Sequence, residues 1–422
     1  MKKWLARISL GLFLFGVLLF GFVFVQSVVT VDVPDTHLRL ARVSIPEESN
    51  AFTVLLEATN HIWWPQKLES EIAGLTKATN SNWDFSFASL VLSNNTEALK
   101  GWDQAVSMPD FQVPECKFED GLEYLSGWKR LAQLASIREN SLMHRGEDLE
   151  AFTEMLQQIR MGRKMQNAHG VLLHYLVGAA VKEIGYSQMR YWAATTRLTP
   201  EQLKNFLSQI EPTADEETIA YANSMIMEYQ LSLTMIDDLR RAKISDPAAG
   251  KIFRSARFVP EFNVSKTKAK LAKDFQLLVD AAPHHYNEVK LPAFPEHPHY
   301  FLLLVGGNAV GEIMCELLEP ALDQAFAKKV RSNVSLQATR TILALRAYQL
   351  THGKLPENLD ALVPEFLDKV PVDAFNGQPL HYSAERKIVY SVGKNLKDDG
   401  GDDRSNAGPD QNHLDVVYAF DF

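Results

Sequence analysis

An uncharged apolar stretch near the N-terminus, Ile8–Val31, limits the arrangement of this chain more than any other feature. As a helix it would rise about 36 Å, which exceeds the roughly 30 Å hydrocarbon core of a bilayer. Charged residues flank it unequally, with Lys2, Lys3 and Arg7 before it and Asp32 and Asp35 after it. Because positive charge stays on the cytoplasmic side, the stretch predicts a single-pass signal-anchor in the cell membrane, with a cytoplasmic N-terminus and an extracytoplasmic (periplasmic) remainder.

Two other interpretations of this stretch stay open. A cleaved signal peptide has a shorter apolar core followed by small residues, and Val25–Val28 is a poor match to such a cleavage site. The stretch could also be a buried helix of a soluble domain. A lipoprotein anchor is excluded, because no cysteine lies near the stretch.

The rest of the chain is long enough for two or three domains. Its 46% hydrophobic and 23% charged residues are ordinary for globular protein, so a sizeable core is available. The patterns described below divide the chain into a cytoplasmic N-terminus (1–7), the anchor (8–31), a juxtamembrane connector (32–46), a helical domain (47–319) and a C-terminal module (320–422).

Helical periodicity dominates after Glu47. Apolar residues recur at three- and four-residue steps, for example at Ala51, Val54, Leu55 and Ala58. Gly146 interrupts the pattern, and Thr199-Pro200-Glu201-Gln202 has the composition of a helix start. The turn at Arg145–Asp148 weakly resembles that of a tetratricopeptide repeat, but no second copy follows at the period of about 34 residues. We therefore expect an irregular, solenoid-like all-helical domain.

The periodicity changes after His352-Gly353, which should end a helix. Apolar residues then alternate at every second position in three short runs: Leu380 and Tyr382; Ile388, Tyr390 and Val392; Leu414, Val416, Tyr418 and Phe420. This alternation predicts three strands with one buried face. The expected fold is thus mostly α, with an N-terminal transmembrane helix and a small C-terminal α+β module that contains a three-stranded antiparallel sheet.

Ordered motifs run through this module: Leu355-Pro356, Val370-Pro371-Val372-Asp373, Gly377-Gln378-Pro379, Tyr390-Ser391-Val392-Gly393 and Gly400-Gly401, with Asp415 in the last strand. Over about the last 90 residues of the chain, they resemble the globular C-terminal domain of type II secretion major pseudopilins. The resemblance implies a pilin-like fold and a calcium ion bound by the loop after Gly393. Pseudopilins carry their membrane helix directly before this module, whereas here it lies far upstream. We therefore expect that this module is a folding unit shared with pseudopilins and that the chain is not a fibre subunit.

The residues of that loop also point to calcium by their chemistry. Calcium takes six to eight oxygen ligands. The loop offers oxygen donors at Asn395, Asp398, Asp399, Asp402, Asp403 and Asp415. Gly400-Gly401 would allow a tight turn, although the spacing does not match an EF-hand. The alternative is a solvated acidic loop that holds no ion.

Three further features suggest binding without defining it. Four histidines lie in or beside a proline-rich segment, His284, His285, His297 and His299, but their spacing matches no zinc pattern. Arg240–Lys273 contains ten Lys or Arg with interleaved phenylalanines. The predicted compartment argues against nucleic acid as its partner and favours anionic lipid, or simply a solvated helix face. Cys116 and Cys315 could form a disulfide or remain separate thiols.

No common catalytic motif is present. The sequence lacks a Gly-x-Ser-x-Gly elbow, a His-Glu-x-x-His helix and a phosphate-binding glycine loop. The sequence therefore favours a membrane-anchored scaffold or binding protein with a protein partner in the envelope. The alternative is an envelope-associated hydrolase whose site is assembled from residues distant in sequence.

Overall fold

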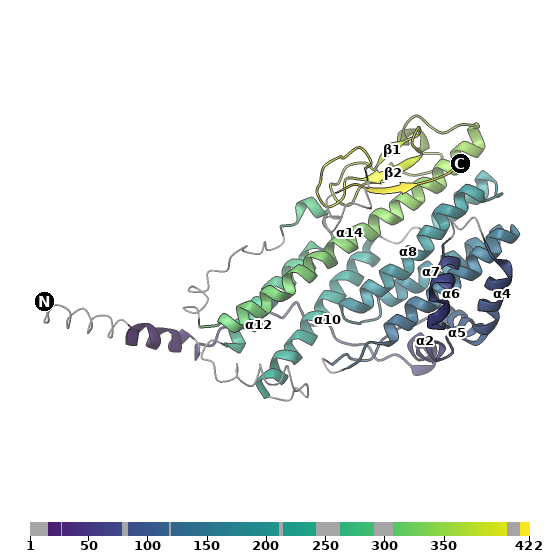
Figure 1. Cartoon of the computed structure of the whole chain (residues 1–422). Coiled ribbons are helices and arrows are strands. Elements are labelled where there is room, and N and C mark those ends of the chain that lie inside the picture. Colours follow the sequence, from purple (N-terminus) through teal and green to yellow (C-terminus); the bar gives the residue numbers. More distant parts are fainter. Residues whose placement is uncertain are drawn as a thin grey trace, which may run out of the picture.

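The computed structural model describes residues 16–26, 28–77, 83–117, 120–210, 214–241, 262–290, 307–402 and 414–422. Within these residues the chain is mostly helical, with one small three-stranded antiparallel sheet beside the last long helix (Figure 1). The predicted combination of a largely helical chain and a C-terminal three-stranded sheet is therefore confirmed.

The first helices form a layer with its own apolar core. They are α2 (Ala51–Asn60), α3 (Glu69–Leu75), α4 (Phe85–Asn94) and α5 (Thr96–Ser107), with the 3-10 turns η1 (Glu47–Ser49) and η2 (Gln66–Leu68). Asn50 caps α2, because its Oδ1 accepts a hydrogen bond from Phe52 N at 3.1 Å. Trp102 of α5 and Trp128 of the following helix are almost fully buried in the shared core.

The middle of the molecule consists of α6 (Tyr124–Arg145), α7 (Asp148–Gln166) and α8 (Leu172–Thr195). α6 ends at Gly146, whose φ of 74° lies in the left-handed region that glycine adopts without steric cost, as the sequence predicted. α7 and α8 approach so closely that a Cβ on Gly162 would lie 2.7 Å from the carbonyl oxygen of Gly178. Two glycines thus set the spacing of these helices.

Within the described residues, four more helices belong to the helical body: α9 (Pro200–Ile210), α10 (Ala214–Arg241), α12 (Val264–Ala281) and α14 (Ala309–His352). Thr199 and Gln202 cap α9 reciprocally, with backbone-to-side-chain hydrogen bonds of 2.9 and 3.3 Å. α14 ends at Gly353, with φ of 73°. It runs without interruption across residues 319 and 320, where the sequence pattern had suggested a domain boundary.

An ion pair between α8 and α10 is buried in this body. Lys182 Nζ lies 2.9 Å from Glu217 Oε1, and the two side chains are 2% and 9% exposed. Burial alone would raise the pKa of Glu217, but Lys182, assisted by Lys329 of α14, holds that pKa below its usual range. The carboxylate is therefore ionised inside the protein, where it depends on Lys182 for compensation.

The three runs of alternating residues form β1 (His381–Ser383), β2 (Ile388–Ser391) and β3 (Val416–Ala419) in the order β1-β2-β3. β2 pairs antiparallel with both neighbours. The 3-10 turn η4 (Leu359–Leu362) follows α14. The buried carboxylate of Asp373 ties the loop before β1 to the end of β2, because it accepts hydrogen bonds from Phe375 N, Ser391 Oγ and Val392 N at 2.9 to 3.0 Å.

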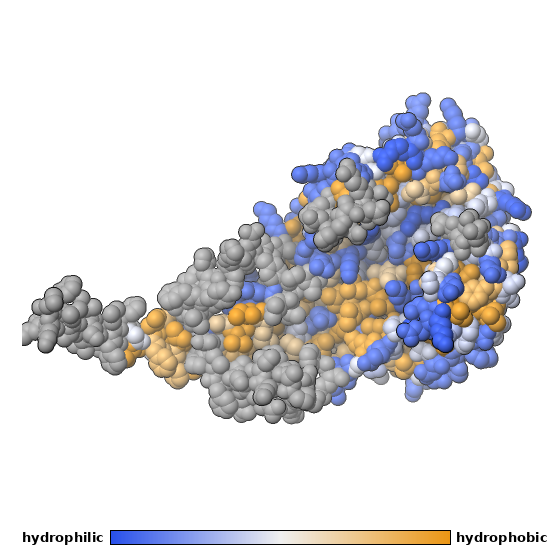
Figure 2. Space-filling model, in the orientation of Figure 1, coloured by the Kyte–Doolittle hydropathy of each residue, from blue (hydrophilic) through white to orange (hydrophobic). Residues whose placement is uncertain are grey.

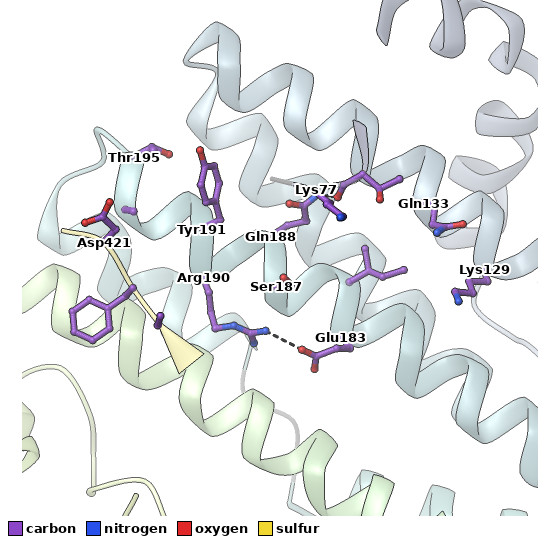
Figure 3. A pocket seen from close by; sticks show the side chains of 15 residues that line it. Lys77, Lys129, Gln133, Glu183, Ser187, Gln188, Arg190, Tyr191, Thr195 and Asp421 are labelled. Atoms are coloured by element: carbon purple, nitrogen blue, oxygen red, sulfur yellow. Dashed lines mark hydrogen bonds and ion pairs between the residues drawn. The ribbon is translucent and has the colours of Figure 1, made fainter. Parts of the chain in front are cut away.

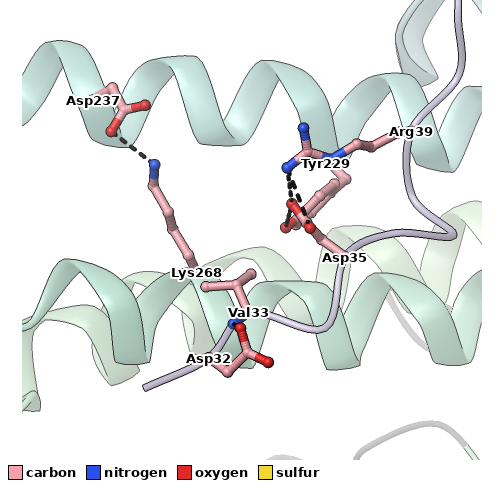
Figure 4. Close-up of polar contacts among 7 residues, drawn as sticks. All are labelled: Asp32, Val33, Asp35, Arg39, Tyr229, Asp237 and Lys268. Atoms are coloured by element: carbon pink, nitrogen blue, oxygen red, sulfur yellow. Dashed lines mark hydrogen bonds and ion pairs between the residues drawn. The ribbon is translucent and has the colours of Figure 1, made fainter. Parts of the chain in front are cut away.

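The connector 32–46 lies against the helical body. Just before the connector, Val31 N donates to Ser265 Oγ of α12 at 3.1 Å. Further along, the carboxylate of Asp35 accepts from Arg39 at 3.0 Å and from the hydroxyl of Tyr229 in α10 at 3.3 Å (Figure 4). Leu38 is fully buried in the main core. The connector therefore fixes the chain that follows the predicted anchor to α10 and α12.

Residues 16–26 are helical, and apolar side chains cover this segment beside the N-terminal end of the molecule (Figure 2). Its exposed large apolar residues include Val17, Leu18, Phe20, Phe22, Phe24 and Val25. Across the described part of the chain, no helix has the length and apolarity that crossing a membrane requires. Residues 8–15 and Ser27 of the predicted anchor lie outside the described residues.

No disulfide joins the two cysteines. Cys315 is buried on α14, with its sulfur 4.0 Å from the carbonyl oxygen of Thr267, whereas Cys116 lies in the partly exposed segment before α6. Of the two possibilities, a disulfide or separate thiols, the structure contains separate thiols.

Candidate functional site

A groove of about 810 Å³ lies between α6, α8, the residues that follow α3 and the C-terminal end of β3. α8 forms its floor with Glu183, Ser187, Arg190, Tyr191 and Thr195, whose three- and four-residue spacings place them on one helix face. Lys77, which follows α3, and Lys129 of α6 line one part of the groove, and Ala419–Asp421 line another. Figure 3 shows Asp421 at one end and Lys129 at the other, with Arg190 and Ser187 between them.

Arg190 holds the floor of the groove in place. Its guanidinium donates to Glu183 Oε1 at 2.8 Å, and to Ser335 Oγ and Thr339 Oγ1 of α14 at 2.9 and 2.8 Å. It also lies over the ring of Tyr418 in β3, 4.7 Å from the ring centre. Arg190 therefore joins α8 to α14 and β3, and its charge is already balanced by Glu183.

The charges along the groove are unequally compensated. Its two acidic side chains are both engaged, Glu183 with Arg190 at 2.8 Å and Asp421 with Lys387 at 3.4 Å. The side chains of Lys77 and Lys129 are exposed, and neither has an ion-pair partner in the part of the chain that the structure describes. The groove consequently presents uncompensated positive charge at one end.

The predicted calcium loop is held by its own hydrogen bonds. Asp415 is the central acceptor, with Gly401 N 2.6 Å from Oδ2 and Asp399 N 3.3 Å from Oδ1. Asn395 Nδ2 donates to Asp399 Oδ2 at 2.8 Å. The guanidinium of Arg386 donates to the carbonyl oxygens of Gly400 and Gly401. The two glycines thus face a cationic group of the protein itself.

A calcium ligand set is not assembled in the described residues. They contain no group of three or more acidic, histidine or cysteine side chains arranged to hold a metal ion. Asp398 accepts from Gly400 N at 2.8 Å and from the hydroxyl of Tyr390 at 3.3 Å, and Asp402 lies at the edge of the described loop. Asp403 lies outside the described residues. The calcium site stays a prediction.

The first two histidines of the histidine-rich segment lie against the C-terminal module. Here the 3-10 turn η3 (Tyr286–Glu288) donates backbone hydrogen bonds to Ala374 and Phe375 at 3.1 and 2.9 Å. His284 contacts Glu288 at 3.4 Å, and His285 lies beside Gly377. His297 and His299 lie outside the described residues. The described part of this segment therefore serves to attach the module to the helical body.

The described part of the basic segment also makes structural contacts. Lys268 pairs with Asp237 of α10 at 2.8 Å, and Lys266 Nζ donates to the carbonyl oxygen of Gln26 at 2.8 Å. Residues 242–261 lie outside the described residues. The start of α12 is therefore joined to the end of the N-terminal helical stretch.

Three polar residues, the buried His174 and Glu139 and the half-buried Tyr124, lie away from the groove. The hydroxyl of Tyr124 and Nε2 of His174 are 2.6 Å apart, and burial lowers the pKa of His174 to about 4. Burial raises the pKa of Glu139 on α6 to about 8, with a smaller contribution from Glu154. None of these three residues lines the groove. We interpret them as interior groups rather than as a reactive site.

No sequence motif identifies the groove. Lys77, Lys129, Arg190 and Ala419 belong to separate elements, and no motif connects them. The available signal in the sequence was the four-residue spacing of Ser187, Tyr191 and Thr195, which places these polar side chains on one face of α8. Comparison of the chain with protein-family models, with curated proteins and with solved structures gave no significant match.

Proposed function

We propose that this chain is a membrane-anchored extracytoplasmic scaffold that binds a protein partner of the cell envelope in the groove between α8 and β3. The observation that carries the proposal is the groove itself, with about 810 Å³ of space and two lysines that lack ion-pair partners among the described residues. Binding sites are typically concave and contain a few uncompensated polar groups. The envelope hydrolase remains the alternative, and no specific observation on the described residues favours it.

The proposed anchor is the apolar stretch 8–31. Its support is the positive charge that precedes it and the contacts that its C-terminal residues and the connector make with the helical body. Val29 O accepts from Asn263 Nδ2 at 2.7 Å, and Asp35 is bound by Tyr229. These contacts would hold the helical body close to the bilayer surface rather than on a long flexible tether.

Contact of Arg240–Lys273 with anionic lipid belongs to the same proposal. α10 ends at Arg241, and α12 begins at Val264 beside Val29 and Val31, at the C-terminal end of the proposed anchor. Asn263, the last residue before α12, contacts Val29 at the C-terminal end of the proposed anchor. Each basic residue near an anionic surface contributes about 1 kcal/mol to membrane attraction.

We also propose calcium as a stabilising ion for the loop that contains Asp398, Asp399 and Asp402. The support is the density of carboxylates and the resemblance to pseudopilins, and Asp403 and Asp415 would contribute further oxygens. When bound, the ion would neutralise these carboxylates and fix the turn at Gly400-Gly401.

Site-specific photo-crosslinking in intact cells tests the groove. A photoreactive residue at Ser187, which is exposed on the groove floor, should yield a crosslink to an envelope protein. The same residue at Glu150, which is exposed on α7, should not, because Glu150 lies outside the groove lining. Equal labelling from both positions, or none from Ser187, would contradict a binding role for the groove. A reporter fused after Phe422 that is active only in the cytoplasm would contradict the topology.

A further inference from the structure

We propose that the groove takes an extended, acidic segment of the partner, which adds as a fourth strand to the outer edge of β3 and reaches Lys77 and Lys129 with its carboxylates. This inference rests on the proposed function and specifies the chemistry of the partner. Three features of the described residues carry it: the hydrogen-bonding direction of β3, the sequence of that strand and the charges along the groove.

β3 is an edge strand with its backbone groups available. Phe420 N donates to Lys387 O at 3.0 Å, so these opposed residues form a hydrogen-bonded pair. In an antiparallel ladder such pairs alternate, and the register therefore directs the backbone of Tyr418 toward β2 and that of Ala419 away from it. Ala419 and Asp421 line the groove. In the described chain, no strand or loop pairs with this edge.

The composition of β3 leaves this edge unprotected. Exposed edge strands usually carry lysine, proline or a bulge that prevents pairing with another chain. Val416–Ala419 contains neither charge nor proline, and its regular register with β2 includes no bulge. Within β3, Val416 and Tyr418 are buried, Val417 is half-buried and Ala419 is exposed, so that the exposed position of the strand carries only a small side chain. An extended peptide could therefore approach the backbone closely.

The charge along the groove selects an acidic peptide. Glu183 and Asp421 are already in ion pairs, but Lys77 and Lys129 are not paired with any described residue. Carboxylates on the bound segment would compensate these lysines, whereas a basic segment would meet repulsion. Charges at the rim of an interface mainly affect the association rate and its salt dependence.

Two variants separate the contributions of strand pairing and charge. Ala419→Pro removes the outward-facing backbone N–H and leaves the hydrogen bonds of Tyr418 and Phe420 to β2 in place, as proline does at sheet edges. Ala419→Ser is the matched control, because it keeps the N–H and the small size. Lys77→Glu combined with Lys129→Glu reverses the charge of the groove without changing residues of the core.

The test uses the full-length protein in detergent and fluorescein-labelled peptides with alternating glutamate and valine, or lysine and valine. We expect the acidic peptide to bind more tightly than the basic one. Ala419→Pro should weaken its binding by about tenfold or more, as expected when a backbone hydrogen bond and the pairing geometry are both lost, while Ala419→Ser should not. The double lysine variant should weaken it on the order of tenfold at low salt, with a smaller effect at high salt.

Equal binding of the acidic and basic peptides would overturn the charge assignment. Unchanged binding to Ala419→Pro would overturn strand addition, as would tighter binding of an acidic peptide that is helical in solution. These outcomes are distinct from failure of the proposed function. If Ser187 crosslinks to a partner in cells but Ala419→Pro leaves that crosslink and the peptide affinity unchanged, the groove binds a partner in another way.

Discussion

Replacing Glu139 by glutamine should stabilise this protein at high pH and leave its stability unchanged at low pH. Glu139 is fully buried on α6, and none of the described residues offers a hydrogen-bond partner to its Oε2. Burial raises its pKa to about 8, the nearby Glu154 adds to this shift, and Arg138 opposes it. The folded protein therefore keeps this carboxyl protonated at pH values where the unfolded chain has released the proton.

The sign and size of the effect follow from the two pKa values. Between about pH 4.5 and about pH 8 the unfolded chain binds fewer protons than the folded one, so the free energy of unfolding falls as the pH rises. Each pH unit corresponds to about 1.4 kcal/mol, which sets an upper limit of about 5 kcal/mol over this range. Local relaxation and water penetration reduce such penalties, and we expect about 2 kcal/mol.

Glutamine has nearly the same shape as protonated glutamate, keeps a hydrogen-bond donor and does not ionise. Urea unfolding of the full-length protein in detergent, measured from pH 4.5 to pH 8, should show Glu139→Gln matching the parent protein at the acidic end. At pH 8 it should exceed the parent by about 2 kcal/mol. Glu150→Gln, at an exposed position on α7, is the control and should follow the parent throughout.

Two results would refute this reasoning. Parallel stability curves for Glu139→Gln and the parent would mean that Glu139 ionises equally readily in both states. A variant less stable than the parent at pH 8 would mean that the buried carboxylate is ionised and paired with Arg138.

Two further predictions concern helix packing and calcium. Gly162→Ala would place a Cβ 2.7 Å from Gly178 O and 2.9 Å from Lys182 N. It should therefore lower the free energy of unfolding, measured with urea, by about 2 kcal/mol. Gly74→Ala is the control, because open space surrounds Gly74, and it should be neutral or stabilising. Calcium at a hundredfold excess over its dissociation constant should stabilise the protein by about 2.7 kcal/mol relative to chelator. In thermal melts Asp399→Ala should reduce this difference and Asp421→Ala should not, and identical melting with calcium and chelator would remove the site.

The sequence predicted features that depend on a few neighbouring residues. Gly146 and Gly353 end helices with φ near 74°, because only glycine adopts that conformation without steric cost. Thr199 and Gln202 cap α9 from three residues apart. The alternation around Tyr382, Tyr390 and Tyr418 identified the strands, because a half-buried strand repeats every two residues. These signals are local, and tertiary packing did not override them.

The sequence could not predict contacts between elements far apart in the chain. The buried pair of Lys182 and Glu217 joins α8 to α10, and neither residue has a local signal that distinguishes it from surface charge. Likewise, nothing in the sequence distinguishes Arg190 from a solvent-exposed arginine, whereas in the structure it contacts α14 and β3.

The sequence by itself therefore determined the helical class, three of the helix termini, the strands and the apolar stretch that suggests an anchor, because each depends on periodicity or on one turn of backbone. Only the tertiary structure decided the groove. Its lining combines Lys77, Lys129, Ser187 and Ala419, and its charge depends on which acidic side chains are already paired. Burial and pairing depend on the arrangement of all the elements in space, which no short stretch of this chain specifies.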